Sequence, residues 1–226
     1  MILYHANKTS FCLDVLNDTL VDNIDDSMVR EVGHSVSPFE KLSWRNSLAF
    51  MDRVISDIGI PENASVAIEY HLPQTSKRID FIITGLNDED QSSAVIVELK
   101  QWSDVQLTEK DGVVKTFLAG GIREHVHPSY QAYTYEQTLR DYNQNIEEFS
   151  INVRSCAFLH NCNQYDVVCD PRYDNYLKIS PSFLKNDAIK LRDFIKTIIK
   201  KGDDLKTLYL IENGKIRPSK SLQEHI

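Results

Sequence analysis

The order of the apolar segments predicts an α/β protein in which a mixed central sheet is flanked by helices. Three consecutive stretches have the residue composition of strands and are joined by short polar loops: 65–72, 78–85 and 94–102. A helical spacing of apolar residues precedes them, another follows, and a fourth strand-like stretch comes next: 38–58, 127–149 and 153–160. Successive strands with helices before and after them favour a sheet that is covered on its faces.

The helix predicted before the three strands carries its own start and stop signals. Ser37 is suited to be the N-cap, Pro38 to occupy the first helical position, and Glu40 to complete a capping box. The helix should end at Gly59 or Pro61, because neither residue continues a helix well.

The chain divides into three predicted parts. Residues 1–36 have apolar residues at roughly helical spacing and predict an N-terminal helical extension. Residues 37–177 contain the predicted α/β core. Residues 178–226 contain a basic amphipathic helix at 187–201 and a polar segment that we interpret as a linker.

The composition is that of a globular protein, with 42% hydrophobic and 26% charged residues among 226. No apolar run approaches the length that spans a membrane, and the N-terminus lacks the long apolar stretch of a signal peptide. The four cysteines, Cys12, Cys156, Cys162 and Cys169, form no CxxC pair. We therefore expect reduced thiols, a cytoplasmic location and no membrane partner.

The net charge of −8 is distributed unevenly. Residues 178–226 contain 11 Lys and Arg against 6 Asp and Glu, a balance of +5, so residues 1–177 carry −13. This acidic part argues against a protein that coats nucleic acid by bulk attraction. It remains compatible with an enzyme whose carboxylates hold divalent cations, because bound ions reverse the local charge.

Three charged residues within the predicted strands form the candidate site. Asp80 lies in the second strand, and Glu98 and Lys100 lie two residues apart in the third, hence on one face. If the two strands pair, the Asp80 and Glu98 carboxylates come together, and they repel each other unless a cation lies between them. Mg²⁺ suits such oxygen ligands, and an ammonium beside it would orient water or stabilise charge on a phosphate. The competing interpretation is the solvated polar face of an ordinary hairpin.

With this order of elements, the sequence resembles the PD-(D/E)XK nuclease superfamily over roughly residues 38–160. The superfamily has a restriction-endonuclease-like αβββαβ core with an Asp in the second strand and ExK in the third. Here Ile79-Asp80 replaces the usual Pro-Asp. The resemblance implies that Asp80, Glu98 and the Leu99 backbone carbonyl hold Mg²⁺ or Mn²⁺ and that Lys100 is catalytic.

The helix after the strands adds a second motif. Gln131 and Tyr135 are four residues apart and share one helical face. They resemble the QxxxY motif of the RecB-like branch, which implies that they position the metal site and the nucleic-acid strand. The alternative is that the tyrosines of this segment are packed core residues.

Five further residues are weaker candidates. Glu69, in the first strand, and Glu40, in the preceding helix, would be accessory metal ligands; an ordinary strand carboxylate and a capping residue are the alternatives. Arg123 and His127 would contact phosphates, although their loop is equally a plain connection. Trp102 would stack on a base, with a core position as its alternative.

Three stretches are closer to one group of proteins: "SWRNSL", "IEYHLPQTSKRIDFIITG" and "VIVELKQW" through "HPSYQAYTYE". They resemble the N-terminal region of bacterial proteins in which such a domain precedes a Schlafen-type superfamily 1 helicase, and "IENGKIRPSKSLQ" resembles the segment leading into it. No GxxxxGK[ST] loop is present. The resemblance implies a nucleic-acid substrate and a helicase domain in cis as partner, and it leaves the oligomeric state open.

Two other functions compete with a nuclease. A nuclease fold retired from catalysis would bind nucleic acid or a partner protein, but such a site is expected to lose its Lys or an acid. A small-molecule hydrolase would need a nucleophile motif such as GxSxG, which is not in the sequence.

Overall fold

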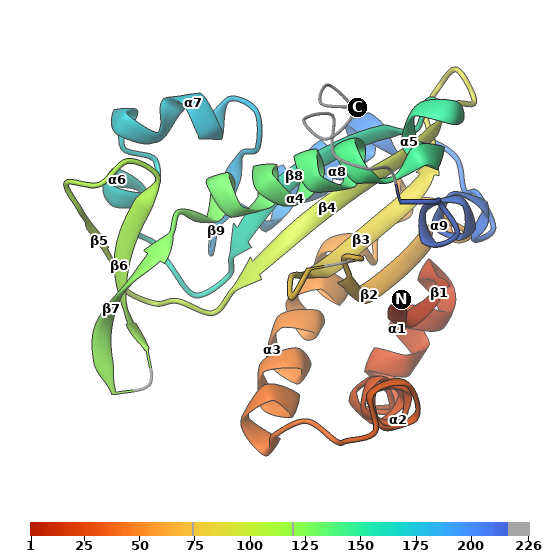
Figure 1. Ribbon diagram of the computed structural model, residues 1–226, viewed down its shortest axis with the longest axis horizontal. Helices are drawn as coiled ribbons and strands as arrows, with labels where there is room; N and C mark the ends of the chain where they lie inside the picture. The colour runs from red at the N-terminus through yellow and green to blue at the C-terminus, as the bar shows by residue number, and fades with distance from the viewer. Residues whose placement is uncertain (74, 119, 217–226) are drawn as a thin grey trace, which may run out of the picture.

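A computed structural model describes residues 1–73, 75–118 and 120–216. The fold is α/β, with a mixed six-stranded sheet flanked by helices, as predicted (Figure 1). The strands occur in the order β1-β2-β3-β4-β8-β9, with these bounds: β1 Ile2–Asn7, β2 Ser65–His71, β3 Arg78–Leu86, β4 Ser92–Lys100, β8 Asn152–Leu159 and β9 Ser182–Leu184. The pairs β1–β2, β2–β3 and β3–β4 are antiparallel, whereas the pairs β4–β8 and β8–β9 are parallel.

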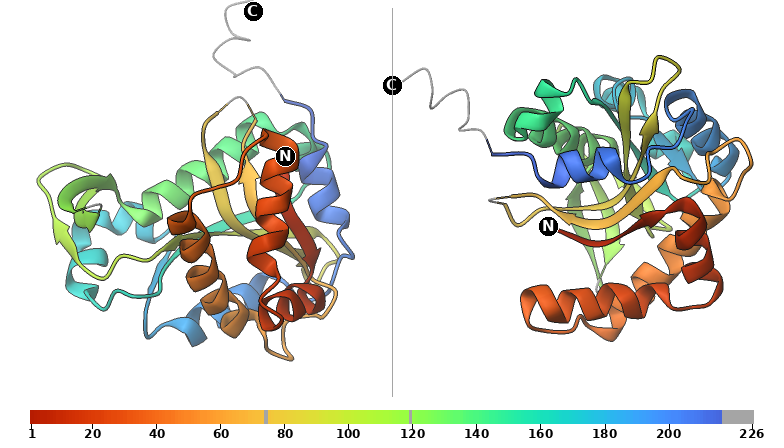
Figure 2. Two further views of the ribbon diagram at one scale, coloured as in Figure 1. Left: turned by 90° about the horizontal axis from the view of Figure 1, so that it is seen from below. Right: turned by 90° about the vertical axis from the view of Figure 1, so that its right-hand side faces the viewer.

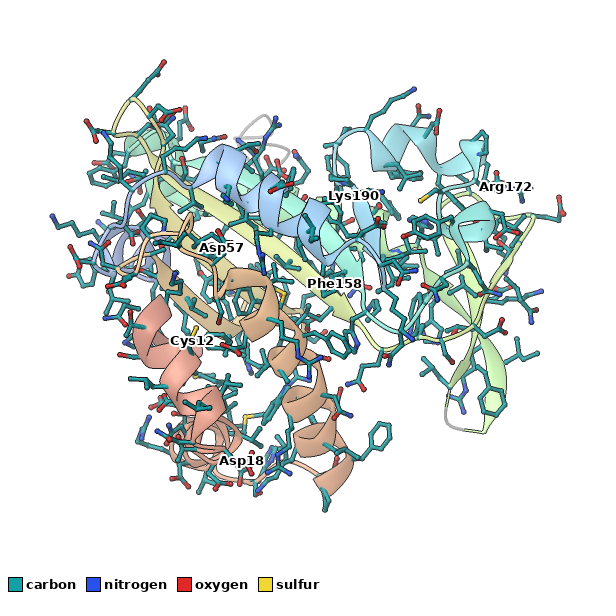
Figure 3. All side chains as sticks on the ribbon, turned by 180° about the vertical axis from the view of Figure 1, so that it is seen from behind. Cys12, Asp18, Asp57, Phe158, Arg172 and Lys190 are labelled. Atoms are coloured by element: carbon teal, nitrogen blue, oxygen red, sulfur yellow. The ribbon has the colours of Figure 1, made fainter. Side chains whose placement is uncertain are left out.

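Helices cover both faces of this sheet (Figure 2). One face packs against α1 Lys8–Leu16, α2 Leu20–Val32, α3 Pro38–Ile55 and α8 Ala188–Ile198, and we call the apolar layer between them the α3-side core. The other face packs against α4 Pro128–Tyr142, α5 Gln144–Glu148 and α9 Lys206–Glu212, and this layer is the α4-side core. Figure 3 shows the side chains of the α3-side core from behind, with Phe158 labelled.

Helix α3 begins as the sequence predicts and ends earlier. The Ser37 hydroxyl accepts a hydrogen bond from the Glu40 N–H at 3.2 Å, and Pro38 is the first helical residue. The helix stops at Ile55 rather than near Gly59, where the Asp57 carboxylate accepts from the Gly59 N–H at 2.8 Å and forms a turn. Asp57 also pairs with Arg192 and Lys196 of α8, which ties this turn to the C-terminal helix.

The predicted helix at 127–149 is two helices, because Asn143 interrupts it. The backbone of Asn143 is extended, and its side chain accepts from the Asn145 N–H at 3.0 Å and donates to the Ile211 carbonyl at 2.6 Å. This side chain therefore caps α5 and binds α9 at the same time.

A second, three-stranded sheet follows β4, where the sequence predicted a connection. It consists of β5 Val105–Leu107, β6 Val113–Leu118 and β7 Gly121–Val126. It packs near three short helical segments, α6 Tyr165–Val168, η1 Pro171–Tyr173 and α7 Asp174–Leu177, through a small third core that includes Trp102, Val114 and Tyr173.

The central sheet contains strands from all three predicted parts of the chain. Residues 2–7 are strand β1 rather than part of a helical extension, because they pair with β2 while α1 and α2 follow. From the predicted C-terminal part, β9 pairs with β8, and α8 buries Leu191 and Ile195. Of the predicted linker, residues 217–226 lie outside the described residues.

Candidate active site at the end of strands β3 and β4

The candidate site lies where β3 and β4 stop pairing. Their antiparallel register runs from Leu86 opposite Ser92 to Phe81 opposite Val97. One residue further on, an Asp80 carboxylate oxygen accepts a hydrogen bond from the Leu99 N–H at 2.8 Å. A side chain thus takes the place of a backbone partner, and the two strands separate next to Asp80.

Asp80 and Glu69 lie where their strands change face. Ile68 and Phe81 point into the α3-side core, whereas Tyr70 and Ile79 point into the α4-side core. A regular strand would place residues two apart on the same face. The change occurs at Glu69, whose φ of 55° is left-handed, and at Asp80 on the neighbouring strand. A left-handed non-glycine residue is strained by roughly 1–3 kcal/mol, and such strain is concentrated at functional sites.

Glu98 and Lys100 form a buried ion pair. The Lys100 ammonium lies 2.7 Å from Glu98 Oε1, and the Glu98 side chain is only 2% exposed. The second carboxylate oxygen of Glu98 is also buried and receives no hydrogen bond from an N–H or O–H donor of the described residues; the Asp80 carboxyl is close enough to share a proton with Glu98 when one of the two acids is protonated. A buried acceptor that receives no hydrogen bond lowers the stability of the fold. A ligand that bound this oxygen would remove that cost.

Burial, and for Glu98 also the charge of Asp80, makes these acids hard to ionise. Burial is the main cause that raises the pKa of Asp80 and that of Glu98, and the Asp80 charge raises the pKa of Glu98 further. The burial of Lys100 would lower its pKa, but the Glu98 and Asp80 charges outweigh burial and raise it. When both acids are ionised, one lysine beside two carboxylates leaves an excess negative charge, which a divalent cation would neutralise.

Helix α4 brings Gln131 and Tyr135 to the same place. The Gln131 side-chain amide donates to the Tyr135 hydroxyl at 2.8 Å. The pKa of Tyr135 rises to about 12, first because the side chain is buried and second because the Glu98 charge is close. The two motifs that the sequence placed on separate elements are therefore neighbours in space.

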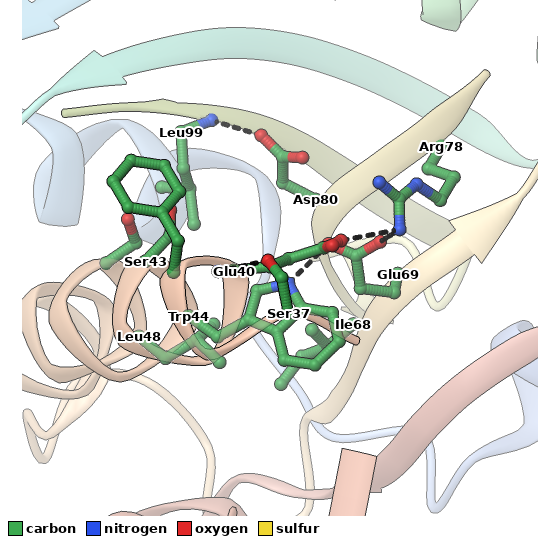
Figure 4. A pocket seen from close by; sticks show the side chains of 12 residues that line it. Ser37, Glu40, Ser43, Trp44, Leu48, Ile68, Glu69, Arg78, Asp80 and Leu99 are labelled. Carbon is green, nitrogen blue, oxygen red and sulfur yellow. Dashed lines mark hydrogen bonds and ion pairs between the residues drawn. The ribbon is translucent and has the colours of Figure 1, made fainter. Parts of the chain in front are cut away.

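A cleft of about 370 Å³ opens between α3 and the ends of the strands on the other side of Asp80 (Figure 4). Its walls include Glu40, Glu69, Arg78 and Asp80. Glu69 accepts from the Trp44 indole N–H at 2.8 Å. Burial, followed by the Asp80 charge, raises the pKa of Glu69 to about 7.

The oxygen-rich site fits Mg²⁺ or Mn²⁺ better than a metal that requires nitrogen or sulfur ligands. Asp80 and the second carboxylate oxygen of Glu98 supply the one or two carboxylates that Mg²⁺ commonly uses. In the segments that the structure describes, no group of three or more His, Cys, Asp or Glu side chains is arranged to hold a metal ion. Waters, phosphate and a backbone carbonyl, for which Leu99 is the predicted source, would complete the coordination.

Two of the predicted substrate-binding residues have structural roles instead. His127 is fully buried: its Nδ1 accepts from the Ser129 N–H at 3.2 Å, and its Nε2 donates to the Val168 carbonyl at 2.9 Å. Both ring nitrogens are used, so the assignment of His127 to phosphate binding is corrected to a cap of α4. Trp102 is 7% exposed and belongs to the third core, so its face is not presented for base stacking.

The other predicted residues remain near accessible surface. Arg123 is exposed on β7, opposite Thr116. Glu40 does not close the predicted capping box with its side chain; its carboxylate pairs with Arg78 at 3.0 Å at the cleft.

Sequence reasoning missed Arg78. Arg78 precedes Asp80 by two residues, and this spacing on a strand could have indicated that both reach the same site. His125 lies close to Trp102, with ring centroids 5.5 Å apart, and its pKa is lowered by burial and then by the Lys100 charge. Its proximity depends on the β5–β7 sheet, for which the sequence offered no signal.

No family model matches the chain, and neither a curated protein nor a solved structure matches it. No helix among the described residues is both long enough and apolar enough to cross a membrane.

Proposed function

We propose that this chain is a divalent-metal-dependent nuclease that hydrolyses phosphodiester bonds of DNA or RNA. The observation that carries the proposal is the buried group formed by Asp80, Glu98 and Lys100 at the separating ends of β3 and β4. The negative charge of its two acids when they are ionised, the Glu98 oxygen that no donor of the described residues reaches and the adjacent ammonium are the components that metal-assisted phosphate chemistry needs.

Each residue has a definite task in this proposal. When bound, Mg²⁺ or Mn²⁺ would polarise the phosphate and make the attacking water more acidic. Asp80 and Glu98 would hold the ion, and Asp80 would also keep β4 in place through the Leu99 N–H. Lys100, held beside Glu98, would orient the water or stabilise charge on the phosphate. Gln131 and Tyr135 would support the site and the nucleic-acid strand from α4.

The partners and location belong to the same proposal. The substrate is nucleic acid, and a helicase domain in cis would supply unwound strands. All four cysteines are free, which supports a reducing compartment such as the cytoplasm.

A specific observation favours a second candidate, a nuclease fold that binds nucleic acid or a protein without cleaving. Lys100 is ion-paired with Glu98, and Arg78 is ion-paired with Glu69, so both cations near the acids already have partners. Such a module would bind its ligand equally well with and without divalent ions.

A cleavage assay separates the two candidates. Single- and double-stranded DNA and RNA are incubated with Mg²⁺ or Mn²⁺ and one of three proteins: wild type, Asp80→Asn or Asp18→Asn. Asp18→Asn is the control, because it changes an exposed acid on the turn between α1 and α2. The nuclease cleaves at least one substrate, loses this activity in Asp80→Asn and keeps it in Asp18→Asn. Metal-independent binding with no cleavage of any substrate would favour the non-catalytic module.

A further inference from the structure

Arg78 lies between two acids of the cleft, beside the proposed catalytic group. One terminal nitrogen of its guanidinium is 3.0 Å from Glu40 Oε1 and 3.1 Å from Glu69 Oε2 (Figure 4). Glu40 comes from α3, Glu69 from β2 and Arg78 from β3, so the guanidinium joins three elements at one point.

Glu69 is held in place for this contact. Its side chain is 6% exposed, and its other oxygen accepts from the Trp44 indole N–H. The contact between its Oε2 and Arg78 is an ion pair rather than a well-aligned hydrogen bond, because Oε2 has no hydrogen-bond partner among the described residues. A buried carboxylate fixed in this way presents an oxygen to whichever cation occupies the cleft.

Asp80 connects this cation position to the proposed metal position. Asp80 lines the cleft together with Glu69 and Arg78, and its carboxylate also accepts from the Leu99 N–H, directly after Glu98 in β4. A carboxylate shared in this way is what a pair of adjacent cations requires in a two-ion phosphodiesterase site.

We propose that the guanidinium of Arg78 occupies the second cation position of the site, so that the chain binds one divalent ion at Asp80 and Glu98 and excludes a second from Glu40 and Glu69. The inference rests on the proposed function, because it assigns the charges around the same metal. While Arg78 holds both glutamates, the described residues do not arrange these acids as a metal site. Removal of the guanidinium should free Glu40 and Glu69 to bind a divalent ion together with the shared Asp80.

The guanidinium suits this role for chemical reasons. It stays charged at all accessible pH values, and its planar fork can bind acids and phosphate together. Arg78 is 36% exposed at the cleft and contacts both acids through a single nitrogen, so its remaining N–H groups can meet a phosphate oxygen. A fixed cation would then stabilise charge on the phosphate where a two-ion enzyme uses its second metal.

Metal stoichiometry tests this inference without reference to activity. Bound Mn²⁺ is counted by the loss of the free-ion signal in electron paramagnetic resonance at about pH 8, on the alkaline side, which favours ionised carboxylates. The variants are Arg78→Gln, Arg78→Lys, the double variant Glu69→Gln/Arg78→Gln, and Arg45→Gln as a matched control in a surface ion pair with Asp18. Circular dichroism and thermal melting verify that each variant is folded.

We expect one ion per chain in wild type, Arg78→Lys and Arg45→Gln, and two in Arg78→Gln. The second ion should disappear in the double variant, because it depends on Glu69. Two ions in the wild type, or one ion in folded Arg78→Gln, would overturn the inference while leaving the proposed metal site intact. Absence of bound Mn²⁺ from every variant would overturn both the inference and the proposed function.

Discussion

Asp80 and Glu98 have a property that connects their burial to metal binding: both carboxyls resist ionisation. Their pKa values are raised mainly by burial, and a metal ion binds only the ionised form. Metal binding should therefore displace protons.

The affinity for Mn²⁺ should consequently increase with pH. Between about pH 6 and about pH 9, the apparent association constant should rise by up to about tenfold per pH unit for each proton displaced. Calorimetric titration in buffers of different ionisation enthalpy measures both the affinity and the protons released. An affinity that does not change over this range would contradict the raised pKa values.

Glu69 makes a separate contribution, which concerns stability. Its pKa rises from 4.5 to about 7 on folding, so the folded state holds a proton that the unfolded state releases. For an acid with a raised pKa, stability is fully present below pH 4.5 and is lost as the pH rises through about 7.

Glu69→Gln should remove this loss, because glutamine does not ionise. As the pH rises from about 4 to about 8, the free energy of unfolding of the variant should increase by about 3 kcal/mol relative to that of wild type. Urea denaturation at several pH values measures the free energy of unfolding of both proteins. The difference between the two values cancels the contributions of titrating groups that both proteins share, such as His127. A constant difference across this range would be inconsistent with a buried, hard-to-ionise Glu69.

At the scale of elements, helix α4 depends on the residue at its start. His127 caps it, bonds to Val168, and stacks on Tyr173 with ring centroids 4.3 Å apart. These contacts fix α4 against η1, and α4 carries Gln131 and Tyr135 to the candidate site.

His127→Ala should lower the free energy of unfolding by about 2–4 kcal/mol, because it removes a cap, a buried hydrogen bond and aromatic packing. His34→Ala, at an exposed histidine, is the control and should change stability by less than about 0.5 kcal/mol. Denaturant unfolding provides the measurement. Unchanged stability of His127→Ala combined with weaker nucleic-acid binding would restore the substrate-binding interpretation.

The elements that the sequence predicted well are those with strong periodicity. Strands β2 to β4 have long apolar runs, and α3 has cap and apolar signals that agree with each other. The β5–β7 sheet was missed because its strands are short or mostly exposed; β7 buries little of "GIREHV", so no apolar alternation marks it. Strand β1 was missed because its pairing with β2 outweighs its local pattern.

The same distinction applies to the site. Asp80, Glu98 and Lys100 were identified because strand alternation and the resemblance agree on them. The Arg78 contacts with Glu40 and Glu69 depend on how α3 packs against β2 and β3, and packing of this kind is not encoded in local spacing. His127 was misassigned because a sequence does not reveal that both its ring nitrogens have partners.

At the scale of the whole molecule, the C-terminal part is bound into the central sheet by Asp203. This buried carboxylate accepts from the Ser65 hydroxyl, from the Thr84 hydroxyl at 2.7 Å and from the Thr207 N–H at 3.1 Å. Its partners lie in β2, β3 and α9, so one side chain joins the two predicted parts of the chain.

Asp203→Ala should therefore destabilise the entire fold, by about 3 kcal/mol, because three buried donors lose their acceptor. Asp193→Ala, at an exposed position of α8, is the control and should change stability by no more than about 0.5 kcal/mol. Thermal or denaturant unfolding should show a single transition shifted as a whole in Asp203→Ala. Two separate transitions would contradict an integrated C-terminal part.

The central claim is that Lys100 acts in catalysis beside acids that hold the metal. Its most direct test is the cleavage rate of Lys100→Gln at saturating Mn²⁺, with Mn²⁺ affinity measured on the same samples and Lys178→Gln as a control at an exposed ion pair. We predict that Lys100→Gln cleaves at least about 100-fold more slowly than wild type while its Mn²⁺ affinity is retained, and that Lys178→Gln cleaves normally. Cleavage by Lys100→Gln at the wild-type rate, or no metal-dependent cleavage by the wild type on any nucleic acid, would contradict it.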